Sequence, residues 1–187
     1  MKKILSIVVI ALCFNFVFTS CSDDDNGNVV VNTDTISKVF EIESSFRFDN
    51  QLGWVINGEL RPAIINGDHL LIYRLSTVTG SGKDVWQLIP RTLYLDLDND
   101  RITESEFSYD YDFSIEDFNI YARGNYDLTL TPGLINEQVF RIVIIPGSNT
   151  GNAFSGKMPI DYKKYNEVIK YYHIDDSKVI KLQPIIK

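Results

Sequence analysis

The chain has 187 residues, of which 44% are hydrophobic and 12% aromatic, and its formal net charge at pH 7 is −7. This acidic balance argues against a nucleic-acid-binding protein, because such proteins need clustered Lys and Arg side chains to displace counterions from phosphates. A domain of about 150 residues buries about 70% of its surface on folding, so the chain is long enough to build a core without disulfide bonds.

Residues 1–20 have the pattern of a signal peptide. Lys2 and Lys3 precede an apolar run over residues 4–18, and small residues follow that run, which is the arrangement of a secretory signal. A transmembrane helix needs about 20 apolar residues to cross a bilayer. Because the run is shorter, and the acidic segment after it offers no positively charged stop signal, we favour a cleaved signal peptide over a membrane span.

The residues after the apolar run predict a lipid anchor. Phe18-Thr19-Ser20-Cys21 resembles the lipobox of bacterial lipoproteins, and this resemblance implies that Cys21 is lipidated and becomes the first residue of the mature chain. The next residues, Ser22, Asp23, Asp24 and Asp25, resemble the acidic signal that exports lipoproteins of Bacteroidetes to the outer face of the outer membrane. Each buried methylene contributes about 0.8 kcal/mol, so the three acyl chains implied for Cys21 would hold the protein firmly.

We expect one domain behind this anchor. Residues 21–34 are polar and rich in Asn and Asp, which indicates a tether, and residues 35–187 form the single predicted domain. Removal of Lys2 and Lys3 with the signal peptide takes the formal charge from −7 to −9. Cys13 lies in the signal and Cys21 would be lipidated, so we expect no intramolecular disulfide.

Alternation of apolar and polar residues dominates the chain beyond the tether and predicts β-strands. The predicted strands cover residues 38–43, 46–49, 53–56, 63–65, 69–73, 84–89, 92–97, 106–115, 118–123, 126–130, 138–145 and 178–182. The dipeptides Asn57-Gly58, Asn66-Gly67 and Gly124-Asn125 predict hairpin turns. Residues 106–115 place aromatic and aliphatic side chains on one face only, whereas residues 138–145 are apolar on both faces and indicate a central, covered strand.

One helix is predicted near the end of the chain. Tyr162, Tyr165, Val168, Ile169 and Tyr172 recur at intervals of three and four residues, and Asp161 precedes them as the expected N-cap. Many short strands with frequent turns and one late helix predict a mainly-β protein. We expect an antiparallel β-sandwich or open barrel with one short C-terminal helix.

Three aspartates resemble the start of a calcium-binding loop. Asp96, Asp98 and Asp100 match the first three acidic positions of the EF-hand pattern. The sixth position, which should be glycine, is Arg101, and the twelfth, which should be glutamate, is Phe107. Asp and Asn also favour ordinary turns, so we favour a hairpin loop and keep a bound calcium ion as the alternative.

Two tryptophans are the candidate ligand-binding residues. Trp54 and Trp86 could stack on sugar rings, but large aromatic side chains also fill sandwich cores, and we favour the core for both. The two histidines, His69 and His173, have no neighbours in the sequence that suggest a catalytic triad. We therefore predict no catalytic residues.

Residues 84–90, 109–113 and 138–146 look similar to small uncharacterised surface lipoproteins of Bacteroidetes. The resemblance implies the same location and a compact β-rich domain, and that group has no established activity to transfer. We expect a lipid-anchored outer-membrane protein facing the cell exterior, acting as a non-enzymatic binding or envelope-interaction module. The alternatives are a glycan-binding accessory lipoprotein and, further away, a divergent hydrolase. The expected partners are the membrane, through Cys21, and a glycan or envelope protein, but not nucleic acid.

Overall fold

The computed structural model describes residues 37–99, 104–147 and 160–185. These residues belong to one compact unit, Asp34–Lys187. The predicted lipidation residue Cys21, the export-signal residues Ser22, Asp23, Asp24 and Asp25, and the third calcium candidate Asp100 lie outside the described residues.

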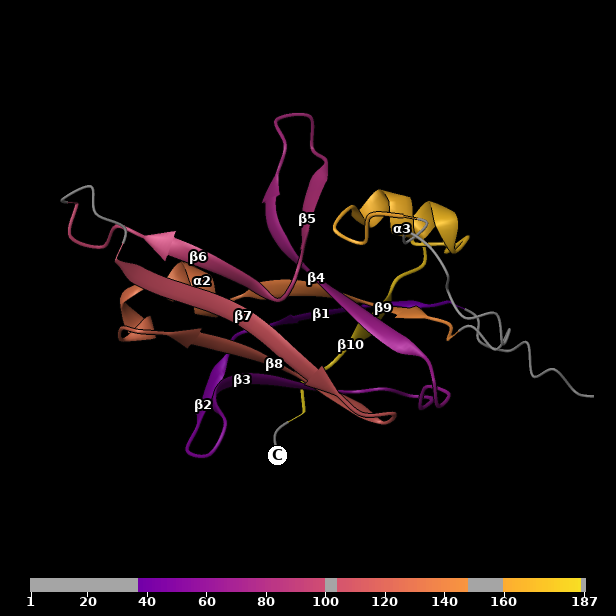
Figure 1. Ribbon diagram of the computed structural model, residues 1–187, viewed down its shortest axis with the longest axis horizontal. Coiled ribbons are helices and arrows are strands. Elements are labelled where there is room, and N and C mark those ends of the chain that lie inside the picture. Colours follow the sequence, from indigo (N-terminus) through magenta and orange to yellow (C-terminus); the bar gives the residue numbers. More distant parts are fainter. Residues whose placement is uncertain (1–36, 100–103, 148–159, 186–187) are drawn as a thin grey trace, which may run out of the picture. The chain divides into compact units, whose positions relative to one another are not determined.

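The strands form two separate five-stranded sheets rather than one closed barrel. The first sheet has the order β10 (Ile180–Leu182), β1 (Val39–Ser44), β9 (Gln138–Ile145), β4 (His69–Val78), β5 (Asp84–Leu88). The second sheet has the order β2 (Arg47–Asp49), β3 (Gly53–Glu59), β8 (Asp117–Gly124), β7 (Ser105–Phe113), β6 (Arg91–Leu95). All neighbours run antiparallel except β1 and β10, which run parallel (Figure 1). The predicted antiparallel β-sandwich is confirmed.

The main core lies between the two sheets. Strand β7 shows how the sequence builds it, because Phe107 and Tyr109 point inward and are fully buried, while Asp110 and Asp112 on the other face are exposed. The predicted one-sided burial of this strand is therefore confirmed. The first sheet supplies an inward layer of aliphatic and aromatic side chains: Phe40, Ile42, Leu70, Ile72, Phe140, Ile142 and Ile144.

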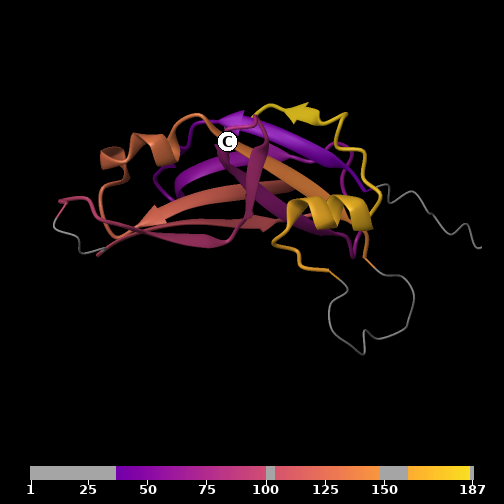
Figure 2. The same cartoon turned by 90° about the horizontal axis from the view of Figure 1, so that it is seen from above.

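A second, smaller core covers the outer face of the first sheet. Helix α3 (Tyr165–Tyr171) and the residues after it pack there through Tyr165, Val168 and Ile174, and Figures 1 and 2 show α3 beside the sheets rather than between them. Strand β9 lies at the centre of the first sheet and is buried on both faces, with Ile142 toward the main core and Val143 toward α3. This confirms the covered central strand predicted for residues 138–145.

The helix begins later than predicted, and its expected cap is wrong. Lys164 occupies the N-cap position without a side-chain hydrogen bond. Asp161 instead closes a turn of its own, because its Oδ1 accepts a hydrogen bond from Lys163 N at 3.0 Å and its carbonyl oxygen accepts one from Lys164 N at 3.0 Å. Aspartate side chains compete with helix formation in this way. Two shorter helical segments, η1 (Leu128–Leu130) and α2 (Pro132–Ile135), were not predicted.

The hairpin predicted at Asn57-Gly58 is wrong, because both residues lie inside β3. Gly58 stands opposite Phe118 of β8, and a Cβ atom at position 58 would overlap the Phe118 ring. Glycine is present there because the strands approach closely, not because the chain turns. The turn at Asn66-Gly67 does form, with Asp68 N donating to the Ile65 carbonyl oxygen at 3.0 Å.

Two predicted strands are absent from the structure. Residues 63–65 form no strand before the Asn66-Gly67 turn. Residues 126–130 contain η1 instead of a strand, so the hairpin predicted at Gly124-Asn125 is wrong as well. The cause is local, since Asp127 caps η1 by accepting a hydrogen bond from Thr129 N at 3.0 Å.

Strand β10 and the residues after it bring the two sheets together at one side. Strand β10 pairs with β1 of the first sheet, and Ile185 N then donates a hydrogen bond of 3.0 Å to the Asn57 carbonyl oxygen of β3 in the second sheet. The residues that follow α3 therefore contact both sheets.

Candidate functional site

The two tryptophans are not brought together into one platform. Trp54 lies on β3 and packs against the main core between the sheets, whereas Trp86 lies on β5 and packs against the smaller core under α3. Each is half-buried, so the prediction that both lie in the core holds only in part. The Trp54 ring has an edge-on contact with Phe48 at 5.7 Å between ring centres.

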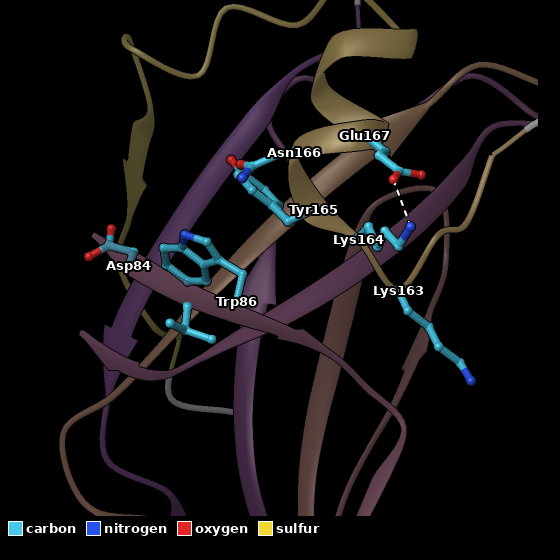
Figure 3. A pocket seen from close by; sticks show the side chains of 8 residues that line it. Asp84, Trp86, Lys163, Lys164, Tyr165, Asn166 and Glu167 are labelled. Atoms are coloured by element: carbon cyan, nitrogen blue, oxygen red, sulfur yellow. Dashed lines mark hydrogen bonds and ion pairs between the residues drawn. The ribbon is translucent and has the colours of Figure 1, made fainter. Parts of the chain in front are cut away.

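A hollow of about 460 Å³ lies between β5 and the first turn of α3, and Trp86 forms part of its wall. Figure 3 shows that β5 contributes Asp84 and Trp86, whereas Lys163, Lys164, Tyr165, Asn166 and Glu167 come from the helix side. A volume in this range suits a small organic ligand. We call this hollow, lined by these residues and Val85, the Trp86 hollow.

Arg141 of β9 holds the Trp86 ring from the protein side. Its guanidinium carbon lies 4.3 Å from the centre of the Trp86 ring and 5.3 Å from the centre of the Tyr165 ring. Its Nη1 donates to the Tyr165 hydroxyl at 2.8 Å, and its Nε lies 3.1 Å from Oε2 of Glu41. Cation–π contacts of this kind contribute roughly 1–2 kcal/mol where water is largely excluded. Trp86 is thus fixed before any ligand arrives.

Two further groups complete the network around Arg141. The Tyr165 hydroxyl donates to Oδ2 of Asp176 at 3.1 Å, and Nη1 of Arg141 lies 3.5 Å from the same oxygen. Lys181 of β10 forms an ion pair with Glu41 on β1. The network therefore ties β9, β1, β10 and the α3 segment to one another behind the wall of the Trp86 hollow.

The charges in this network are stabilised by their partners. Burial disfavours the ionised Glu41 carboxylate, but hydrogen bonds from Lys181 and Arg141 outweigh it, so the pKa of Glu41 lies below its ordinary value. Burial raises the pKa of Tyr165, and its phenol therefore stays protonated and able to donate to Asp176. The Glu41 carboxylate therefore stays ionised beside Arg141 at neutral pH.

Three polar side chains of the Trp86 hollow are available to a ligand. Asp84, Lys163 and Asn166 are exposed, and the structure gives their side chains no hydrogen bond to another described residue. Lys164 is engaged differently, because its Nζ lies 2.8 Å from Oε1 of Glu167 (Figure 3). The hollow therefore offers an indole ring, a carboxylate, an amide and an ammonium group.

The calcium candidates lie on the connection between β6 and β7, which pair as a hairpin. Asp96 is half-buried, Asp98 is exposed, and Asn99 adopts a φ of 61°, a left-handed conformation typical of turns. Within residues 37–99, 104–147 and 160–185, no group of three or more His, Cys, Asp or Glu side chains is placed to hold a metal ion. Asp100 lies outside these residues, so the complete triplet is not tested.

The histidines occupy unrelated positions. His69 begins β4 and contacts the Phe113 ring edge-on at 5.3 Å, whereas His173 follows α3 with a φ of 54°. Neither side chain forms a hydrogen bond to a carboxylate or hydroxyl group of the described residues. The part of the chain that the structure describes therefore assembles no histidine-dependent triad.

Sequence reasoning missed a row of polar side chains across the outer face of the second sheet. Arg47 Nη2 donates to Asn57, Asn57 Nδ2 donates to Asn119, and Asn119 Nδ2 donates to Asp112 at 2.8 Å. The Tyr121 hydroxyl also donates to Asp112, at 2.7 Å. These residues come from four strands, and their registers cannot be read from the sequence. The row links the strands of the second sheet on the side away from the main core.

Comparison with known proteins adds no relative. No family model matches this chain, and the searches of curated proteins and of solved structures found no match either.

Among the helices of the described residues, none is long and apolar enough to span a bilayer.

Proposed function

We propose that this chain is an exported, lipid-anchored binding protein, not an enzyme, and that the Trp86 hollow is its ligand-binding site. The observation that carries this proposal is the fixed position of Trp86 against Arg141, with three exposed polar side chains beside it. An aromatic wall that needs no rearrangement lowers the entropic cost of binding.

The anchor in this proposal is Cys21. Support comes from the signal-peptide pattern of residues 1–20, the lipobox-like segment ending at Cys21 and the acidic residues that follow it. Residues 21–34 would then tether the sandwich to the outer face of the outer membrane, as in the surface lipoproteins of Bacteroidetes that the chain resembles.

A glycan is the ligand that the Trp86 hollow favours. A sugar ring has an apolar face that packs on an indole and hydroxyl groups that pair with carboxylate, amide and ammonium groups. Trp86 supplies the first element, and Asp84, Asn166 and Lys163 supply the second. The hollow is large enough for a small saccharide. An envelope protein is the alternative partner.

Binding is tested with the full-length chain, solubilised in detergent and applied to an array of immobilised glycans. We expect selective binding that falls at least about tenfold in Asp84→Asn, which loses the charge and one acceptor oxygen, and in Asn166→Ala, which loses the whole amide. Both side chains are exposed, so folding should be unaffected. Tyr94→Ala, which removes an exposed aromatic ring on β6, is the matched control. Equal binding by all four proteins would refute the assignment of this hollow.

The anchor is tested separately in cells. We expect Cys21→Ser to lose incorporation of labelled palmitate and to leave the membrane fraction, whereas Cys13→Ser, in the predicted signal peptide, should retain both. A Cys21→Ser protein that stays acylated and membrane-bound would refute the anchor without bearing on the ligand.

The calcium alternative at Asp96, Asp98 and Asp100 has its own test. Because we favour a hairpin loop there, we expect the thermal melting curve with calcium to coincide with the curve in chelator. A rise of Tm with calcium that disappears in Asp98→Asn would instead establish a calcium site.

A further inference from the structure

A second hollow, of about 430 Å³, lies at the end of the second sheet where β3 begins and β8 ends. Its lining includes the aromatic residues Trp54 and Tyr126, the aliphatic residues Leu52 and Leu128, and the acidic residue Asp127. We call it the Trp54 hollow. A volume in this range suits a small organic molecule.

The protein holds both aromatic side chains of the Trp54 hollow in place. Trp54 is half-buried against the main core, and the Phe48 ring contacts it edge-on. The Tyr126 hydroxyl shares a hydrogen bond of 2.7 Å with Oγ1 of Thr131, which fixes the Tyr126 ring. A ligand that enters the hollow therefore meets aromatic surfaces that need no ordering.

These two rings have no cation from the protein itself. Three arginines of the described residues lie over aromatic rings, namely Arg74 over Tyr109, Arg123 over Tyr121, and Arg141 over Trp86 and Tyr165. Within the described ranges no cation lies over Trp54 or Tyr126 in this way. The face of an aromatic ring is negative and attracts cations, and tryptophan attracts them most strongly. Trp54 can thus take its cation from a ligand, whereas Trp86 already has Arg141.

Arg123 lines the Trp54 hollow but does not present its charge there. Its guanidinium carbon lies 4.8 Å from the centre of the Tyr121 ring, and the Tyr121 hydroxyl donates to Asp112 on the outer face of the second sheet. Trp54 lies on the opposite face, toward the main core. The charge that the hollow presents is therefore the negative charge of Asp127.

The Asp127 carboxylate is fixed and ionised. Its Oδ1 accepts hydrogen bonds from Thr129 N at 3.0 Å and from the Thr129 hydroxyl at 2.8 Å. These bonds hold the pKa of Asp127 below its ordinary value. The structure gives Oδ2 no hydrogen bond within the described residues, so this oxygen is available to a ligand.

The Trp54 hollow suits a different ligand from the Trp86 hollow. Its described lining residues include no amide and no ammonium group, and the Tyr126 hydroxyl is already bonded. A sugar would leave hydroxyl groups unpaired there, which is unfavourable. A methylated ammonium group has no N–H to pair, and its charge is attracted by aromatic faces and by a carboxylate.

We propose that the Trp54 hollow binds a small quaternary ammonium compound. Its methyl groups pack against the rings of Trp54 and Tyr126, and its positive charge lies near Oδ2 of Asp127. This site goes beyond the proposed glycan site, because the two hollows lie on different sheets and share no lining residue. Glycan binding and ammonium binding can therefore fail separately.

Binding is tested by calorimetry with choline and the full-length chain in a non-ionic detergent. The decisive comparison is the neutral analogue of choline in which a carbon atom replaces the nitrogen, because it keeps the shape and removes the charge. We expect choline to bind and the neutral analogue to bind at least about fivefold more weakly. Absence of choline binding, or equal affinity for the two compounds, would overturn the proposal.

Glycerophosphocholine distinguishes a free compound from a lipid headgroup. Its phosphate adds a negative charge near Asp127, so we expect it to bind more weakly than choline. A higher affinity than that of choline would overturn the assignment to a free ammonium compound.

Variants locate the site. We expect Trp54→Leu to lower the affinity for choline at least about fivefold. Tyr94→Leu is the matched control, because Tyr94 is an exposed aromatic residue on β6, and it should leave the affinity unchanged. An equal loss in both variants, or no loss in Trp54→Leu, would overturn the assignment of this hollow.

Trp54 also packs against the main core, so a second variant guards against misfolding. Asp127→Asn keeps an oxygen that can cap η1 but loses the charge. We expect it to melt as the wild type does and to bind choline about threefold more weakly, since the carboxylate is exposed. Unchanged affinity in a normally folded Asp127→Asn protein would contradict the role given to Asp127.

Discussion

The guanidinium group of Arg141 lies 4.3 Å above the Trp86 ring while its Nε lies 3.1 Å from the Glu41 carboxylate. Arg141 lies on the central strand β9 and thus connects the edge strand β5, on one side of β9, with β1 on its other side. The rigidity of the Trp86 hollow depends on an ionic contact beneath it.

Loss of the Arg141 guanidinium should strongly lower the stability of the protein. Arg141→Gln leaves Glu41 and Asp176 without their shared cation and Trp86 without its stacking partner, and breaking a largely buried ion pair costs about 3–5 kcal/mol. Because Lys181 still pairs with Glu41, we expect a loss of about 2–4 kcal/mol in the free energy of unfolding, measured by urea denaturation. Arg61→Gln, which breaks the exposed pair with Glu59, should cost less than about 1 kcal/mol. Similar losses in both variants would contradict the role assigned to Arg141.

The Glu41 carboxyl should make stability depend on acid pH. Its pKa in the folded protein lies below the ordinary value of 4.5, so its contribution is complete above that value and is lost as pH falls through the folded pKa. We expect the wild type to lose more stability than Glu41→Gln between about pH 5 and pH 3. Urea denaturation of both proteins across this range measures the difference, and parallel curves would contradict it.

Position 58 should tolerate no side chain. Because a Cβ atom there would overlap the buried Phe118 ring, Gly58→Ala forces the ring or the strands apart, and we expect a loss of about 1–3 kcal/mol. Gly80→Ala is the control, since nothing lies within 4 Å of the added Cβ atom. Thermal melts should show a lower Tm for Gly58→Ala alone, and an unchanged Tm would show that the strands are farther apart than described.

The polar row on the second sheet should contribute to stability. Asn57 is 1% exposed and joins Arg47 to Asn119, so Asn57→Ala leaves both partners with an unsatisfied group at a cost of about 1–3 kcal/mol. Asn136→Ala removes an exposed amide without a side-chain hydrogen bond among the described residues and should change little. Equal unfolding free energies for the two variants would mean that water replaces the hydrogen bonds of Asn57 without loss of stability.

The strands were predictable where apolar side chains occupy one whole face or both faces of the strand. Alternation identified β7, because its four aromatic side chains at positions 107, 109, 111 and 113 share the face toward the main core. The fifth apolar residue of the predicted strand, Ile115, lies beyond β7 and is 49% exposed. Continuous apolarity identified β9, because only a strand covered on both sides tolerates it. In these two strands, the pattern of apolar side chains was sufficient to identify the element.

Other features depended on contacts that the sequence does not display. Asn57-Gly58 has the composition of a turn, and only the approach of Phe118 explains why glycine stands inside a strand. The support of Trp86 was not predictable either, since Arg141 is separated by 100 residues from Glu41 and by 35 from Asp176. Sequence patterns thus located Trp54 and Trp86 as candidates but could not assign them to two different sheets.

The parallel pairing of β1 with β10 affects how this protein is made. The ion pair across these strands, between Glu41 and Lys181, joins residues 140 positions apart. While the ribosome delivers the chain, β1 therefore keeps one unpaired edge until residue 182 has emerged. An unpaired strand edge is prone to intermolecular pairing, so this edge of the first sheet is protected only once the last strand has been synthesised.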